Sequence, residues 1–389
     1  MQLSLLFALL PVVLAAPPIQ PGDGVPIKDQ YVVVLKSDLV GASLMQAQKM
    51  VTTGVIQTFD VGTFKGFSAK ISKDALAQIK KLDSVAYVEQ DKIITVNFEA
   101  EKSAYKNQTG APWGLARISS RTKGKTNYLY HESAGAGTCS YVIDTGIDVT
   151  HTNFQGRATW LSNHAGDGSN TDGNGHGTHC AGTIGSKTYG VAKKTKLYAV
   201  KVLNAAGSGT LSGVIAGINF AANDAQTRDC PNGTFANLSL GGAKSDALNA
   251  AAAAAVNSGL FLGVAAGNSA TDAKDFSPAS EPTVFTVGAT DIVDEMAWFS
   301  NFGAIVDAFA PGVDVLSTWP GNTTNTISGT SMATPHLVGL AAYLSTLEGK
   351  RTPANLTSRI RNLCHRRILT GIPSGTTNRL IFNRTPYAK

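Results

Sequence analysis

The sequence predicts an α/β protein with a mainly parallel sheet covered by helices on both faces, preceded by a small α+β domain. After about residue 110, apolar strand patterns alternate with helical patterns, which is typical of a parallel sheet with crossover helices. Before residue 98 the patterns instead follow a βαββαβ order. Only 15% of the 389 residues are charged, and glycine and alanine are abundant, which favours a large buried core over disorder.

The chain begins with an apolar run, residues 3–16, that is too short to span a membrane and ends in small residues. We interpret residues 1–15 as a secretory signal peptide and expect the protein to be secreted and extracellular. No later segment of the sequence has the length and apolar content of a membrane span.

The small domain follows a Pro/Gly-rich linker at residues 17–26. Its strand patterns lie at 30–36, 54–61, 66–72 and 85–96, and its helical patterns at 39–51 and 73–83. This order predicts a ferredoxin-like unit. Residues 98–110 are polar and irregular, which indicates an exposed boundary that a protease could cut.

In the large domain, strand patterns lie at 139–145, 196–203, 235–242, 260–268 and 282–291. Helical patterns follow Gly175 and cover 211–223, 246–256 and 336–347. In such sheets, functional residues collect at the carboxyl ends of the strands.

Ser331 lies at the start of the last of these helices, in the stretch SGTSMATP. The first N–H groups of a helix lack partners within it, so they can stabilise an oxyanion that forms beside Ser331. Pro335 is tolerated near the first turn, where its missing N–H costs little. An isolated stretch of this kind is more often an ordinary turn before a core helix, so two further stretches decide its meaning.

Those stretches contain Asp144 in YVIDTGID and His176 in DGNGHGTHCAG. A strand-end Asp is usually a turn or cap residue when it stands alone. His176 lies between two glycines, where the backbone can approach closely. His179 follows three residues later and raises the question of zinc, but the metalloprotease pattern has histidines four apart with a Glu between them. A general base is the better interpretation of His176.

Asp144, His176 and Ser331 occur in the order Asp, His, Ser, and the stretches VIDTGID, GHGTHCAG and GTSMATP resemble those of the subtilisin-like serine proteases. APWGLARISS, YGVAKKTKLYAVKVL and SPASEP are similar to the proteinase K subgroup of secreted fungal endopeptidases. The resemblance covers residues 111–347. It implies hydrolysis of peptide bonds through an acyl-enzyme, with Ser331 as nucleophile, His176 as base and acid, and Asp144 orienting the imidazole.

The resemblance also implies an oxyanion hole and a substrate cleft. The oxyanion donors are the side-chain amide of Asn268 and the Ser331 backbone N–H. The residues implied to bind an extended peptide are Gly207, Ser208, Gly209, Leu211, Ser239, Leu240, Gly241, Ala265, Ala266 and Gly267. Broad specificity is expected, with a preference for an apolar or aromatic residue before the cut. Leu211 stands where proteinase K has a tyrosine, so the more distant subsite is expected to differ.

By the same resemblance, the small domain is the chain's own propeptide, which acts as chaperone and inhibitor. We expect a propeptide at 16–105 and a peptidase domain at 106–389, with self-cleavage after Tyr105. Protein and peptide substrates are the other expected partners, and we expect a monomer.

Four cysteines occur, and residue patterns alone do not pair them. The resemblance implies a Cys139–Cys230 disulfide and a free Cys180 thiol beneath the catalytic His. The family's other disulfide is missing, because Phe285 occupies one partner position and Cys364 falls past the other. Cys364 is therefore expected to be unpaired, or else paired in a way that the sequence does not reveal.

No cofactor is expected for the chemistry, but the resemblance implies a structural calcium ion. Its ligands are the Asp307 carboxylate and the backbone carbonyls of Pro282 and Val284. A second, weaker calcium site is expected to be lost, because Arg121 and Arg367 fall near its ligand positions.

The net charge of +6 is mostly scattered, and its densest run, 359–367, is interpreted as the solvated face of a terminal helix rather than a patch for an anionic surface. No nucleic-acid motif accompanies it, and neither nucleic acid nor membrane is expected as a partner. Asn237 falls inside an apolar strand pattern and is disfavoured as a glycan site. The expected glycosylation sites are Asn107, Asn232, Asn322, Asn355 and Asn383.

Two other functions are considered. A catalytically inactive relative would only capture peptides, but the complete triad and Asn268 argue against it. A dinucleotide-binding oxidoreductase would need a GxGxxG after a strand, and none is present.

Overall fold

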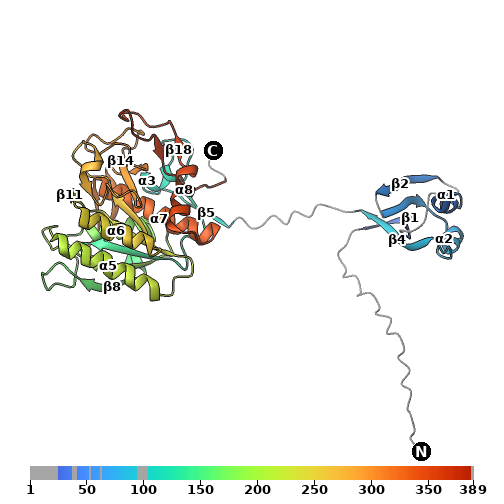
Figure 1. Cartoon of the computed structure of the whole chain (residues 1–389), viewed down its shortest axis with the longest axis horizontal. Coiled ribbons are helices and arrows are strands. Elements are labelled where there is room, and N and C mark those ends of the chain that lie inside the picture. Colours follow the sequence, from blue (N-terminus) through green and yellow to red (C-terminus); the bar gives the residue numbers. More distant parts are fainter. Residues whose placement is uncertain (1–24, 37–41, 52–53, 62–63, 94–103, 387–389) are drawn as a thin grey trace, which may run out of the picture. The chain divides into compact units, whose positions relative to one another are not determined.

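A computed structural model describes residues 25–36, 42–51, 54–61, 64–93 and 104–386. The chain divides into two compact units, Met1–Glu101 and Lys102–Lys389 (Figure 1). The expected signal peptide lies outside the described residues. Among the helices that are described, none is both long and apolar enough to cross a membrane.

The first unit has the predicted βαββαβ order. Its elements are β1 (Val25–Leu35), α1 (Ala42–Gln48), β2 (Val55–Val61), β3 (Phe64–Lys70), α2 (Lys73–Ile79) and β4 (Val85–Ile93). The strands form an antiparallel sheet in the order β2-β3-β1-β4. Val33, Phe67 and Ile79 are fully buried between the sheet and the helices. The ferredoxin-like prediction is therefore confirmed.

The second unit is built on a nine-stranded sheet in the order β18-β19-β15-β14-β12-β10-β7-β9-β8. Its strands are β7 (Cys139–Asp144), β8 (Ala158–Asn163), β9 (Lys196–Lys201), β10 (Thr234–Leu238), β12 (Phe261–Ala265), β14 (Phe285–Thr290), β15 (Ala308–Pro311), β18 (His365–Arg366) and β19 (Arg379–Leu380). All pairs are parallel except β18–β19, which confirms the mainly parallel sheet.

Helices cover both faces of this sheet. On one face α4 (His176–Gly185) and α7 (Thr330–Glu348) pack against each other and against the strands. On the other, α5 (Leu211–Thr227) and α6 (Asp246–Asn257) lie side by side (Figure 1). Because side chains alternate along a strand, Val142 of β7 joins the first core while Tyr141 and Ile143 join the second.

The remaining elements surround this framework. They are α3 (Trp113–Ile118), α8 (Pro353–Leu363), the short strands β5 (Tyr105–Gln108), β6 (Tyr128–His131), β11 (Gly242–Ala243) and β13 (Phe276–Ser277), the hairpin of β16 (Val315–Trp319) and β17 (Thr323–Ile327), and two 3-10 turns at Thr152–Phe154 and Ala273–Asp275. The basic run 359–367, predicted to lie in one terminal helix, is divided: α8 ends at Leu363, Cys364 caps the helix, and β18 then pairs with β19.

The order of the strands fixes where a site can form. From β7 the chain continues to β8 and β9 on one side, and then crosses to β10 on the other side of β7. A sheet of this kind opens a crevice at the carboxyl ends of the strands where the order reverses. Asp144 is the last residue of β7 and therefore stands at that crevice.

Candidate active site

The first element of the site is a carboxylate–imidazole pair. His176 is the first residue of α4, and its Nδ1 lies 2.7 Å from Asp144 Oδ1. Gly175 before it has a φ of +107°, a conformation that suits glycine and turns the chain into the helix. Asp144 is fully buried, whereas the His176 side chain is 25% exposed. The Asp144 end of the imidazole is thus closed from solvent, while the ring remains accessible to a substrate.

The charge state of this pair follows from its surroundings. Burial lowers the pKa of His176, but the charge and hydrogen bond of Asp144, followed by the charge of Asp172, raise that pKa above its ordinary value. Asp144 therefore favours the imidazolium that forms when His176 accepts a proton.

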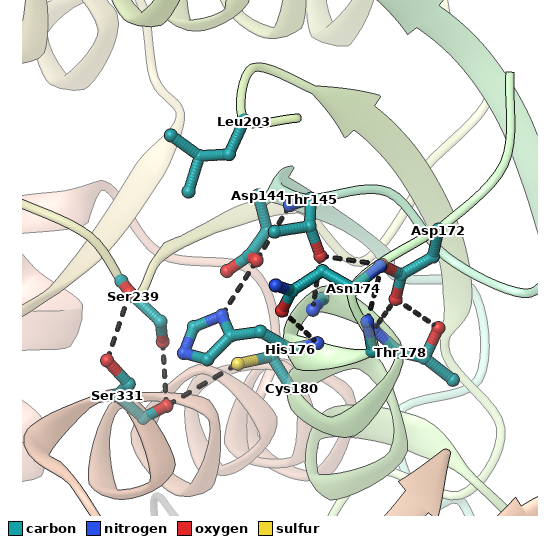
Figure 2. A network of polar contacts seen from close by, with 12 residues as sticks. Asp144, Thr145, Asp172, Asn174, His176, Thr178, Cys180, Leu203, Ser239 and Ser331 are labelled. Atoms are coloured by element: carbon teal, nitrogen blue, oxygen red, sulfur yellow. Dashed lines mark hydrogen bonds and ion pairs between the residues drawn. The ribbon is translucent and has the colours of Figure 1, made fainter. Parts of the chain in front are cut away.

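A second buried carboxylate, Asp172, connects the strand that ends at Asp144 to the helix that begins at His176. It accepts five hydrogen bonds: from Thr145 Oγ1, from the N–H groups of Asn174 and Gly175, and from the N–H and Oγ1 of Thr178 (Figure 2). Thr145 directly follows Asp144, and Gly175 directly precedes His176. Asp172 therefore links the end of β7 to the start of α4, a role that its place in a glycine-rich run did not indicate.

Ser331 is the second residue of α7, as predicted, and Figure 2 places the His176 ring between it and Asp144. Its Oγ donates to the Ser239 carbonyl at 3.0 Å. Pro335 lies inside α7 and cannot donate to the carbonyl four residues earlier, which belongs to Ser331. That carbonyl instead accepts from Ser239 Oγ at 2.8 Å and from the Cys180 thiol at 3.5 Å. Pro335 thus frees an acceptor through which Ser239 and Cys180 hold the serine.

Asn268 lies beside Ser331 with a fixed amide orientation. Its Oδ1 accepts from the backbone N–H of Thr330 at 2.8 Å and from Thr330 Oγ1 at 2.9 Å. Because Thr330 holds the Oδ1 of Asn268, the Nδ2 group at the other end of the amide is free to donate to a ligand. Asn268, Thr330 and Ser331 line one cavity, so Nδ2 and the start of α7 can both donate to an oxygen bound there.

Two neighbouring cavities collect the predicted substrate-binding residues. The first, of about 810 Å³, is lined by Gly207, Ser208, Gly209, Leu211, Ser239, Leu240 and Gly241. The second, of about 300 Å³, is lined by Ala265, Ala266 and Gly267 together with Leu240 and Gly241. The fold brings all ten predicted residues to the same region as His176 and Ser331.

Several further residues line the first cavity that sequence reasoning did not single out. Leu203, Val214 and Leu248 supply apolar wall, and Lys244 and Asn174 supply polar wall. Leu203 ends an apolar strand pattern and Leu248 lies in an apolar helix pattern, so both resembled ordinary core residues in sequence. The only available signal was their position at the carboxyl edge of the sheet.

The cysteines behave as expected. Cys139 and Cys230 form the disulfide, and Cys180 and Cys364 are both free and buried. Burial raises the pKa of the Cys180 thiol well above its ordinary value, which keeps it protonated. Among the described residues, Asp144, His176 and Cys180 form the one cluster of potential metal ligands, but a protonated thiol is a poor ligand. His179 does not join them, because its Nε2 lies 2.9 Å from the Val315 carbonyl.

The predicted calcium site does not fit the residues around it. Asp307 Oδ2 accepts from the Thr286 N–H at 2.8 Å, and Oδ1 contacts the guanidinium of Arg361. A calcium ion bound to this carboxylate would have to displace an arginine that already neutralises it.

One predicted glycosylation site needs correction. Asn383 is fully buried, and its Nδ2 donates to the Leu129 carbonyl at 2.7 Å, so a glycan at Asn383 is incompatible with the folded domain. Asn237 is buried too, in line with its exclusion. Asn107, Asn322 and Asn355 are exposed and Asn232 is half-buried, and these four sites stay predictions.

The geometry defines a class of protein: a hydrolase in which a serine at a helix start, an Asp-paired imidazole and an amide donor surround one crevice. Comparison with known proteins shows the family. Residues 135–375 match the Subtilase family and residues 30–97 match Peptidase inhibitor I9. The chain belongs to the subtilase family and is a serine endopeptidase with an inhibitor-type N-terminal domain. Subtilases need no cofactor for their chemistry and commonly bind structural calcium.

Relatives match over nearly the whole chain. The chain is 50% identical to "Cuticle-degrading protease" of Metarhizium anisopliae, with 98% of this chain and all of the relative covered. It is 52% identical to "Subtilisin-like serine protease AsES" of Sarocladium strictum, with 99% and 100% covered. Among solved structures, a cold adapted subtilisin-like serine proteinase is 42% identical with a TM-score of 0.68, and covers 71% of this chain and all of its own.

Proposed function

We propose that this endopeptidase cleaves peptide bonds with Ser331 as nucleophile, His176 as general base and acid, and Asp144 as the residue that orients the imidazole. The observation that carries the proposal is the 2.7 Å contact between His176 Nδ1 and buried Asp144, on a ring that faces Ser331. Because that contact takes Nδ1, Nε2 is the nitrogen left for the proton of Ser331.

The steps follow from these positions. Ser331 Oγ attacks the peptide carbonyl as His176 takes its proton, and the tetrahedral oxyanion accepts hydrogen bonds from Asn268 Nδ2 and the Ser331 N–H. His176 then gives the proton to the leaving amine, and water hydrolyses the acyl-enzyme in a second round of the same transfers.

The two cavities support the specificity that we propose. The second cavity, walled by Ala265, Ala266 and Gly267, has no charged lining and suits an apolar or aromatic residue before the cut. In the first cavity, Leu211 is 48% exposed and forms an apolar wall together with Val214 and Leu248. That wall suits an apolar residue further upstream in the substrate.

We further propose that the chain is exported by residues 1–15, carries its propeptide at 16–105, and works as a monomer after self-cleavage near Tyr105. The boundary between the two compact units, at residues 101–102, supports a cut close by. Tyr105 begins β5, which pairs with β6, so the new N-terminus would be held at the edge of the peptidase domain.

The test uses the full precursor and its Ser331→Ala variant, expressed in a secretory host. Intact mass, the N-terminal sequence and cleavage of an aromatic-containing peptide are recorded. We expect the wild type to start near Lys106 and to cut, and the variant to remain joined to its propeptide and inert. Ser328→Ala, in the same stretch, should behave as the wild type. If Ser331→Ala is processed and equally active, Ser331 is not the nucleophile.

A further inference from the structure

Asp307 occupies the edge of the sheet opposite to the active site. It directly precedes β15, whereas Asp144 ends β7, and the strands of this region are parallel. Only 7% of its side chain is exposed. A buried carboxylate needs a countercharge or several donors. If the countercharge is a bound ion, the stability of this edge depends on that ion; if it is a side chain, it does not.

The countercharge comes from the chain itself. Arg361, in the last turn of α8, contacts Oδ1 through its guanidinium, and the Thr286 N–H occupies Oδ2. A second arginine, Arg379 of β19, donates to the Asp307 backbone carbonyl at 3.5 Å. Both oxygens of the carboxylate and its main-chain oxygen are therefore engaged by donors.

This arrangement is unfavourable for a divalent cation. Calcium binds sites with several oxygen ligands and net negative charge. Here the one carboxylate contacts the guanidinium of Arg361, a second guanidinium, that of Arg379, lies at the main-chain carbonyl of the same residue, and the other predicted ligands, the carbonyls of Pro282 and Val284, are uncharged. Within the described residues, Asp307 is the only carboxylate that forms an ion pair with Arg361. The two positive charges of a calcium ion would be added to a site whose net charge is already positive.

We infer that the Arg361 guanidinium replaces a structural calcium ion in this chain. Arg361 neutralises Asp307 from within, ties α8 to the start of β15, and makes the stability of the peptidase domain independent of calcium. The internal cation cannot be removed by a chelator.

Thermal unfolding tests this inference, with the mature enzyme inactivated by a sulfonyl fluoride so that it does not digest itself. Melting is followed in EDTA and in excess calcium chloride, and bound calcium is counted by atomic emission after dialysis. We expect the wild-type Tm to be the same in both solutions within about 2 °C, whereas an ion present at about a thousand times its Kd would raise it by roughly 10 °C.

Substitutions then locate the effect. Arg361→Ala should have a lower Tm in EDTA and should recover part of that loss in calcium. Arg359→Ala removes an arginine from the same helix that contacts Glu348 instead of Asp307, and its Tm should not respond to calcium. A wild type that holds one calcium ion, which Asp307→Asn loses, overturns the inference. If Arg361→Ala does not fold, the wild-type calcium response alone decides: indifference supports the inference and a rise of roughly 10 °C overturns it.

Discussion

Buried carboxylates at the two edges of the large sheet have different hydrogen-bond donors. At the carboxyl edge, Asp144 and Asp172 accept hydrogen bonds from backbone N–H groups, hydroxyls and an imidazole. At the opposite edge, Asp307 contacts Arg361, and Glu348 at the far end of α7 contacts three arginines. Neutral donors leave the negative charge free to act on His176, whereas guanidinium groups cancel it. We therefore expect substitutions at the first edge to change turnover and substitutions at the second to change stability.

The largest effect is expected for Asp144→Asn, which keeps the shape of the side chain but removes the charge. The kcat should fall by on the order of 10⁴-fold, because an amide no longer fixes the tautomer or stabilises the imidazolium. A mature variant released at an engineered protease site allows kcat and Tm to be measured without self-processing. Asp148→Asn, a more exposed acid in the same loop, should keep kcat within about twofold. An equal loss of kcat in both variants would contradict the assignment.

A smaller loss is expected for Asn268→Ala. Removing one oxyanion donor should lower kcat by about 10²- to 10³-fold and leave KM nearly unchanged, because the hydrogen bond strengthens only as the oxyanion forms. Steady-state kinetics with a chromogenic peptide separate the two constants. A raised KM with unchanged kcat would mean that Asn268 binds the substrate rather than the transition state.

Residues at the first edge were largely predictable because local stretches carry them. A strand followed by a Thr-Gly turn put Asp144 at the carboxyl edge, and the apolar helix after SGTSMATP put Ser331 at a helix start. Asp172 was missed, since an acid among glycines looks like any loop residue until its five donors, spread over residues 145–178, are folded around it.

Residues at the second edge were less predictable because their partners are distant in sequence. Arg361 and Asp307 are 54 residues apart, and the basic run gave no sign that one of its members faces inward. Asn383 contacts Leu129 across 254 residues, so the local sequon around Asn383 could not show that this side chain is buried. Patterns of three to eight residues identify chemistry, but countercharges and burial depend on which distant segments meet.

At the second edge, Glu348→Gln should reduce stability without changing kcat. The pKa of Glu348 is lowered to about 2, mainly by hydrogen bonds from Arg359 and further by those from Arg384 and Arg351. Burial raises this pKa and opposes the effect in part. Since the folded pKa lies below the ordinary value, the stabilisation is present above that ordinary value and is lost as pH falls toward 2. We expect the variant to melt roughly 5 °C below the wild type at neutral pH, with the difference vanishing near pH 2. A difference that persists unchanged at low pH would show that the charge of Glu348 is not its source.

The smallest effect, and the sharpest test of the comparison, is expected for Asp172→Asn. The charge of Asp172 contributes to raising the His176 pKa, and His176 must be neutral to act as a base. Removing that charge lowers the His176 pKa, so the acid limb of the kcat/KM profile should move to lower pH, by less than about one unit. A purely structural role would lower kcat and Tm without moving the limb. Thr178→Val, which removes one donor to Asp172 but keeps its charge, serves as the control. If the limb stays in place in Asp172→Asn, as it should in Thr178→Val, Asp172 acts only through geometry, and the proposed action of its charge on His176 is wrong.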